Sequence, residues 1–151
     1  MAEIHDRIEA DLKAAMKGGD RLRVSTLRMV TSELVNRRIE FGRPLTLEEE
    51  LEVLGRAAKQ RRESEEQFRA GGRDEMADRE AAEAGIVRAY LPEPLDPAEL
   101  DRLIDEAVER LGAASPAAMG AVMGDLMPRV KGRAEGADVS RRVREKLIPR
   151  G

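Results

Sequence analysis

Apolar residues recur every three or four positions along most of the chain, and glycine or proline interrupts the pattern at intervals. This spacing places apolar side chains on one face of an α-helix. No stretch shows the sustained apolar–polar alternation of a half-buried strand. The pattern therefore predicts an all-α protein, with helices over about 3–17, 20–42 and 46–70, a fourth that runs to Leu91, and a fifth over 96–112. A sixth helix opens at Ser115-Pro116 and carries Leu126, and a last one spans about 136–148.

Three of these helices begin with a recognisable capping sequence. Asp20 can cap the second helix, and Thr46 with Glu49 three residues later forms a capping box for the third. Asp96 followed by Pro97 gives the clearest start. Aspartate accepts hydrogen bonds at the N-cap, and proline fits the first helical position.

A proline-rich segment at 92–97, within the stretch YLPEPLDP, interrupts the helical pattern. Proline lacks the backbone N–H that a helix interior needs, and it disfavours helical backbone at the residue before it. The helix before this segment is expected to end near Leu91. We expect the chain to divide here into two parts.

The composition fits a helical protein and excludes several kinds of site. Aromatic residues make up only 2% of the chain, so the core must be built from Leu, Ile, Val, Met and Ala. The absence of cysteine excludes a disulfide, a thiolate nucleophile and a cysteine-based metal site. The single histidine, His5, is expected to lie on the surface. No metal site and no cofactor are expected.

Nucleotide-binding and hydrolase motifs are missing from the sequence. It contains no Gly-Lys pair, no Gly-x-Gly and no Gly-x-Ser-x-Gly, which excludes a P-loop, a dinucleotide fingerprint and a nucleophile elbow. The carboxylates of LEEELE at 47–52 fall in the first turns of a helix, where the helix dipole favours negative charge. No catalytic residue is predicted.

Two absences bear on location. The longest uncharged run, at 111–124, is shorter than the roughly 18 residues that a membrane-spanning helix needs. The first residues include Glu3 and Asp6 and do not form a basic start followed by an apolar run. We therefore expect a cytoplasmic protein without a membrane partner.

The third helix carries charged residues where its apolar stripe should continue. The stripe formed by Leu47, Leu51, Leu54 and Ala58 projects onto positions 61 and 65. Two interpretations stay open. Arg61 with Glu65, and Arg62 with Glu66, can form surface ion pairs one turn apart, each contributing about 0.2–0.5 kcal/mol. Alternatively, Arg61, Arg62 and Glu65 form a half-buried polar joint or a partner-binding face. We favour the surface pairs.

The C-terminal stretch MGAVMGDLMPRVKGRAEG, at 119–136, holds the main candidate site. Gly120 and Gly124 share one helix face, where small residues would let another backbone come close. Lys131, Gly132 and Arg133 then precede a helix that bears Arg141, Arg142 and Arg144. Cations beside a helix N-terminus are suited to phosphate binding.

The charge distribution agrees with a phosphate site here. Residues 119–151 carry eight basic and four acidic side chains, or +4, whereas the whole chain carries −3. No aromatic residues are interleaved, so an RNA would be bound by its backbone shape and not by its sequence. The alternative is that this element is only a joint between helices.

The chain resembles the YqeY-like family nearly end to end. Four stretches carry the resemblance: STLRMVTSELVNRRIE, KQRRESEEQFRAGGR, YLPEPL and MGAVMGDLMPRVKGRAEGADVSRRVREKL. From about Asp96 the chain also resembles the tail domain of the B subunit of aspartyl/glutamyl-tRNA amidotransferase. That tail contains a Gly…Lys-Gly-Lys-Ala-Asn-Pro element. The residues that match it are Gly124, Lys131, Gly132, Arg133 and Ala134, and Glu135-Gly136 replace Asn-Pro.

The resemblance implies a multi-helix N-terminal domain over 1–95 and a small three-helix C-terminal domain over 96–151. It also implies association with tRNA and, at the level of the family, with glutamine-dependent carbon–nitrogen ligase activity. The expected partners are tRNA and components of amidotransferases or tRNA synthetases. The amidotransferase's catalytic domain and its glutaminase have no counterpart in this sequence.

Three hypotheses follow for the function. The leading one is a non-catalytic helical tRNA-associated module in which Lys131 and Arg133 contact phosphate. The second is an amidotransferase component that is active only with partner subunits. The third is a protein–protein adaptor that uses the acidic segment 74–118, which carries −8, or the Arg61/Glu65 helix face.

Overall fold

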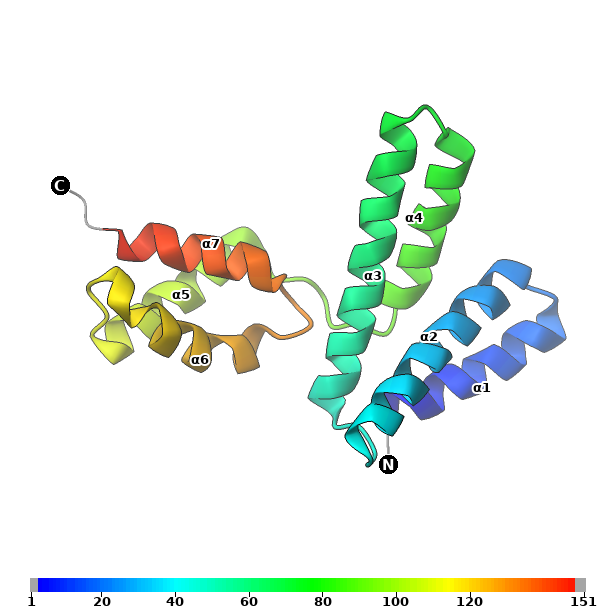
Figure 1. Cartoon of the computed structure of the whole chain (residues 1–151), viewed down its shortest axis with the longest axis horizontal. Coiled ribbons are helices and arrows are strands. Elements are labelled where there is room, and N and C mark those ends of the chain that lie inside the picture. Colours follow the sequence, from blue (N-terminus) through cyan, green and yellow to red (C-terminus); the bar gives the residue numbers. More distant parts are fainter. Residues whose placement is uncertain (1–2, 149–151) are drawn as a thin grey trace. The chain divides into compact units, whose positions relative to one another are not determined.

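The computed structural model describes residues 3–148 and is all-α, as predicted. The chain divides into two compact units, Met1–Pro92 and Glu93–Gly151 (Figure 1). In chain order, the helices are α1 (Glu3–Gly18), α2 (Arg21–Phe41), α3 (Leu47–Ala70), α4 (Asp74–Arg88), α5 (Pro97–Leu111), a 3₁₀ turn (Pro116–Ala118), α6 (Met119–Val130) and α7 (Gly136–Leu147). The assignment of residues 1–95 and 96–151 as domains stays a prediction, because compactness alone does not show that each part folds independently.

The first unit consists of two helical hairpins, α1–α2 and α3–α4 (Figure 1). Its core is aliphatic, as the composition predicts, except for the buried Tyr90. The buried side chains of this core come from all four helices and from the segments that follow α2 and α4: Ile4, Ile8, Leu27, Val30, Leu34, Leu45, Val53, Leu54, Ala57, Ala58, Val87 and Tyr90.

The capping residues act as the sequence predicts. Asp20 Oδ1 accepts a hydrogen bond from the Arg23 N–H at 3.1 Å. Thr46 and Glu49 exchange the two bonds of a capping box. Helix α4 ends at Arg88, three residues before the predicted end at Leu91, because the backbone there tightens into turns that precede Pro92.

A buried carboxylate of α3 caps α1. Glu50 is 1% exposed, and its two carboxylate oxygens accept from the N–H groups of Ile4 at 3.4 Å and His5 at 2.8 Å. Glu50 therefore stabilises the start of α1 and also lies in the first turn of α3.

The expectation that His5 is a surface residue is wrong, because its side chain is only 12% exposed and its Nε2 lies 3.1 Å from Glu9 Oε1.

The second unit is a bundle of α5, α6 and α7 (Figure 1). Each helix contributes residues spaced three or four apart to one core: Leu100, Ile104, Ala107, Val122, Leu126, Val130, Val139, Val143 and Leu147. Asp96 caps α5 by accepting from the Ala98 N–H at 2.9 Å, and Gly112 ends it at φ +61°. Within residues 3–148, none of the helices is both long and apolar enough to cross a membrane.

Candidate nucleic-acid interface

The turn between α6 and α7 holds the residues predicted to contact phosphate. Lys131 is the C-cap of α6, and Gly132 follows with φ +79°, a left-handed backbone that favours glycine. Arg133 comes directly after this glycine. The chain therefore reverses at Gly132 with a cation on each side of it, and α7 begins three residues after Arg133.

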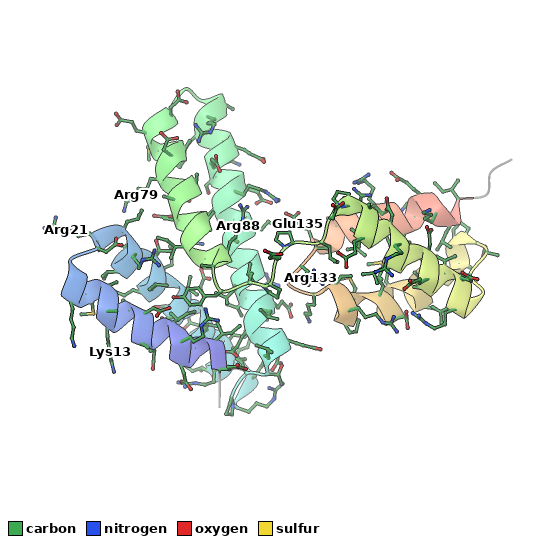
Figure 2. All side chains as sticks on the ribbon, turned by 180° about the vertical axis from the view of Figure 1, so that it is seen from behind. Lys13, Arg21, Arg79, Arg88, Arg133 and Glu135 are labelled. Carbon is green, nitrogen blue, oxygen red and sulfur yellow. The ribbon has the colours of Figure 1, made fainter. Side chains whose placement is uncertain are left out.

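Arg133 also has a structural role that the sequence did not indicate. Its Nε donates to the backbone oxygen of Glu93 at 3.0 Å, and its own backbone oxygen accepts from the Leu95 N–H at 2.8 Å. Figure 2 shows Arg133 beside the segment that precedes α5. Its two terminal nitrogens have no hydrogen-bond or ion-pair partner among residues 3–148. One edge of the guanidinium is therefore used to hold the turn, and the other is available to a ligand.

Two of the candidate arginines on α7 are tied to Asp138 in the first turn of that helix. Arg141 donates to Asp138 Oδ1 and also to Glu145 Oε1, at 3.2 Å. Arg142 Nε donates to Asp138 Oδ2 at 3.2 Å. Partial desolvation raises the pKa of Asp138, but the hydrogen bonds from Arg141 and Arg142 outweigh it and hold that pKa below its ordinary value. Their charge is thus largely neutralised within the helix.

The positive charge of the C-terminal segment is cancelled by the acidic residues of 93–118, most of which lie on α5. Arg142 Nη1 lies 3.0 Å from Asp101 Oδ1, and Lys146 Nζ lies 2.7 Å from Asp105 Oδ1. Residues 93–151 together carry ten basic and eleven acidic side chains, or −1. The +4 of residues 119–151 therefore does not describe the folded unit.

Arg144 differs from the other two arginines of α7. At 100° per residue, it lies on the opposite flank of the helix from Arg142, which faces α5. It is exposed, and no ion pair or hydrogen bond of its side chain is found among residues 3–148. Arg144 and the terminal nitrogens of Arg133 are thus the predicted groups with the clearest access to a ligand.

The N-terminus of α7 is less favourable to phosphate than the sequence indicates. Glu135 is the N-cap residue, and its side chain makes no capping bond. Asp138 is in the first turn. Because two carboxylates lie where the helix dipole attracts an anion, they compete with a phosphate for that position.

Among residues 3–148, Gly120 and Gly124 do not have the predicted packing role. A Cβ built on either glycine would meet nothing within 4 Å, and both residues are exposed. The core face of α6 is formed by Val122, Leu126 and Val130, and the glycines lie outside it. The small residues were correctly placed on one face, but no other backbone among residues 3–148 approaches that face.

Replacing both exposed glycines with alanine is expected to stabilise the protein. Alanine restricts the unfolded chain more than glycine does, so each change should add about 0.4–1 kcal/mol to the free energy of unfolding. Urea denaturation of Gly120→Ala/Gly124→Ala tests this. Gly132→Ala is the contrasting control, because φ +79° makes alanine unfavourable there and should lower stability. A destabilised double variant would contradict the open environment of these glycines.

Arg61 is buried, and its ion pair is not the predicted one. It is 5% exposed, and its Nε lies 3.7 Å from Glu83 Oε2 on α4. Glu65 instead pairs with Arg69, at 3.1 Å. The favoured surface pair between Arg61 and Glu65 is therefore wrong, because the apolar stripe of α3 continues into the contact with α4 and carries Arg61 inward. The role of Arg61, Arg62 and Glu65 as a partner-binding face stays a prediction. Arg61 itself is buried and cannot contribute to an exposed face.

The environment of Arg61 is a polar joint between α2, α3 and α4. Its Nη1 donates to the Ala57 backbone oxygen at 2.8 Å, and its Nη2 contacts Met29 Sδ of α2 at 2.9 Å. Its buried Nε has no hydrogen-bond partner in the described part of the chain, since 3.7 Å to Glu83 is too long. Desolvation raises the pKa of nearby Glu33, and the charge of Arg61 opposes that rise. The sequence signal for this joint was the charged residue on an apolar stripe, but Glu83 was not predicted.

No group of three or more His, Cys, Asp or Glu side chains among residues 3–148 is arranged to hold a metal ion.

A family model described as Yqey-like protein matches residues 5–147. The chain belongs to the YqeY-like family. The match spans both compact units, so the turn at 131–133 and the polar joint between α2, α3 and α4 both lie within the part that the family shares.

Three fungal relatives are named "Altered inheritance of mitochondria protein 41, mitochondrial". The protein of Pyrenophora tritici-repentis is 30% identical over 143 residues, which cover 92% of this chain and 78% of that protein. The protein of Clavispora lusitaniae is 32% identical over 84 residues, covering 56% and 49%. The protein of Lachancea thermotolerans is 30% identical over 112 residues, covering 72% and 60%.

These relatives contradict the expected cytoplasmic location, because all three are named as mitochondrial proteins. The expectation rested on the lack of a secretory signal pattern and of a membrane-spanning run. Neither feature distinguishes a cytoplasmic protein from a protein that works inside mitochondria, so the inference was wrong.

Proposed function

We propose that this YqeY-like protein is a tRNA-associated helical module related to the tail of glutamine-dependent tRNA amidotransferase. The observation that carries the proposal is the reversal at Gly132, which places Lys131 and Arg133 on either side of a left-handed glycine. The resemblance of residues 124–134 to the amidotransferase tail supports it. The names of the relatives do not mention tRNA.

The contacts in this proposal go to RNA phosphates. Lys131, the terminal nitrogens of Arg133 and the exposed Arg144 supply the cations. Arg141 and Arg142 mainly hold α7 to its own first turn and to α5. All three aromatic residues of the chain precede residue 93, so the second unit has no side chain on which a base can stack. Binding is therefore expected to follow backbone shape and to depend on salt.

Neutralising the turn is expected to weaken tRNA binding. The variant Lys131→Gln/Arg133→Gln removes both charges. In its Arg133→Gln change, the side-chain amide nitrogen is separated from Cα by the same number of bonds as the arginine Nε. The bond to Glu93 can therefore be kept while the charge is lost. Losing two phosphate contacts should make the slope of log affinity against log salt shallower by about 1.8. Filter binding of an unmodified tRNA transcript at salt concentrations from about 50 to about 200 mM measures this.

The matched control is Arg56→Gln/Arg102→Gln, which removes the same charge from two exposed arginines. Arg56 pairs with Glu52, and Arg102 pairs with Glu106, so neither belongs to the turn. The control should bind tRNA like the wild type. Equal slopes for the turn variant and the control would contradict the phosphate role of the turn.

The alternative is that this protein is an enzyme component, an amidotransferase subunit that is active only with partner subunits. Release of ammonia from glutamine by a mixture of this chain with tRNA amidotransferase subunits, beyond that of the subunits alone, would favour it over a binding module.

A further inference from the structure

A hollow of about 570 Å³ opens at the junction of α1 and α2. It is lined by residues from the end of α1, the connecting turn and the first two turns of α2: Met16, Gly19, Arg21, Val24, Ser25 and Arg28. Figure 2 shows Arg21 at this end of the α1–α2 hairpin. The hollow is separate from the turn at 131–133, which belongs to the other compact unit.

Both arginines of this hollow are available to a ligand. Arg21 and Arg28 are exposed, and their side chains have no ion pair or hydrogen bond with any other residue in 3–148. By contrast, Arg23 between them pairs with Asp20 at 3.4 Å. Several of the candidate arginines of the second unit are likewise paired. The hollow is therefore lined by two arginines of α2 whose side chains are free to meet a ligand.

The polar side chains of the hollow lie along one face of α2, where they can donate to the sugar–phosphate backbone of a nucleic acid. Arg21, Ser25 and Arg28 lie at positions i, i+4 and i+7 of α2, on the face that points away from the buried Leu27 and Val30. The two arginines are about 10 Å apart along the helix axis, at about 1.5 Å per residue. Arginine forks and serine hydroxyls are common donors to phosphate oxygens in nucleic-acid complexes.

Cations outnumber carboxylates around the hollow. Residues 12–32 contain five cations and one carboxylate, or +4. Including the flanking Asp11 and Glu33, residues 11–33 carry +2. Lys13 and Lys17, on the same hairpin, are exposed as well (Figure 2 labels Lys13). A polyanion would therefore be attracted to this end of the hairpin.

We propose that the surface formed by Arg21, Ser25 and Arg28 binds phosphodiester groups of RNA, as a second contact surface besides the turn at 131–133. The choice of RNA as the polyanion rests on the proposed function. An acidic protein is a weaker fit. A protein interface needs an apolar core, and Met16 is the single large, exposed apolar side chain that lines the hollow within the described residues.

The test is a salt titration of the binding of an unmodified tRNA transcript to the full chain. Arg21→Ala/Arg28→Ala should bind at least about tenfold more weakly at about 50 mM salt and show a slope shallower by about 1.8. Ser25→Glu should weaken binding to a similar extent, because it places a carboxylate between the arginines. Ser25→Ala should change binding less than about threefold. Arg56→Ala/Arg102→Ala, which makes the same change in net charge, should bind like the wild type.

The outcomes separate this inference from the proposed function. If tRNA binds and depends on Lys131 and Arg133, but Arg21→Ala/Arg28→Ala matches the charge control, the second surface is overturned and the proposed function stands. If the wild type fails to bind tRNA at about 50 mM salt, both are overturned. If polyglutamate of equal charge competes as well as tRNA does, the surface recognises acidic chains in general, and its assignment to RNA is overturned.

Discussion

Replacing Arg61 with alanine is expected to lower the free energy of unfolding of the first unit by about 3 kcal/mol. Arg61 and Glu83 are 5% and 8% exposed, and removing the arginine takes the buried one of two guanidinium groups away from a buried carboxylate. Arg79 also lies 3.4 Å from Glu83, but its side chain is 66% exposed, so it compensates only in part. This places the expected loss at the lower end of the range for broken buried pairs.

Urea denaturation followed by circular dichroism measures this loss, and two further variants show its cause. Arg61→Met/Glu83→Leu removes both charges and should be close to the wild type, because apolar pairs of similar volume often replace buried ion pairs without loss. Arg79→Ala should cost less than about 1 kcal/mol, since the Arg79 side chain is itself 66% exposed. If Arg61→Ala lost no more stability than Arg79→Ala, the buried joint would not stabilise the fold.

Replacing Ile104 with alanine is expected to unfold much of the second unit. Ile104 is fully buried at the centre of the core shared by α5, α6 and α7. Such a truncation costs about 2–5 kcal/mol. A unit of about 60 residues has a small core and only a few kcal/mol of total stability, so the change removes most of it.

Circular dichroism during urea denaturation should then show an early loss of helix from the second unit, while the first unit unfolds at its wild-type midpoint. Leu111→Ala on the same helix is the control, because Leu111 is 44% exposed and should cost less than about 1 kcal/mol. This result would also support the assignment of residues 96–151 as a separate domain. A single transition that shifts as a whole would contradict independent folding.

Local signals in the sequence predicted the starts of three helices correctly. Asp20, Thr46 and Asp96 start helices where predicted, because a cap depends on residues two or three positions away in the chain. The apolar spacing likewise identified the aliphatic cores. The end of α4 was misplaced by three residues, at the approach to Pro92.

The sites were harder to predict, because they depend on partners that are distant in sequence. The window 119–151 looked basic because Asp101 and Asp105, which neutralise Arg142 and Lys146, lie some 40 residues earlier. A charged residue on the apolar stripe of α3 signalled something unusual at Arg61, but the sequence did not reveal that Glu83 would face it. The hollow at the α1–α2 turn was missed, since Arg21 and Arg28 stand out only once their neighbours are seen to be paired.

The most direct test of the account is the salt dependence of tRNA binding by the unmodified full chain. The account predicts measurable binding at about 50 mM salt that weakens steeply toward about 200 mM and is similar for tRNAs of different sequence, because phosphates and not bases are contacted. Absence of binding at the lower salt concentration, or binding that is insensitive to salt, would contradict the proposed role of the protein as a tRNA-associated module.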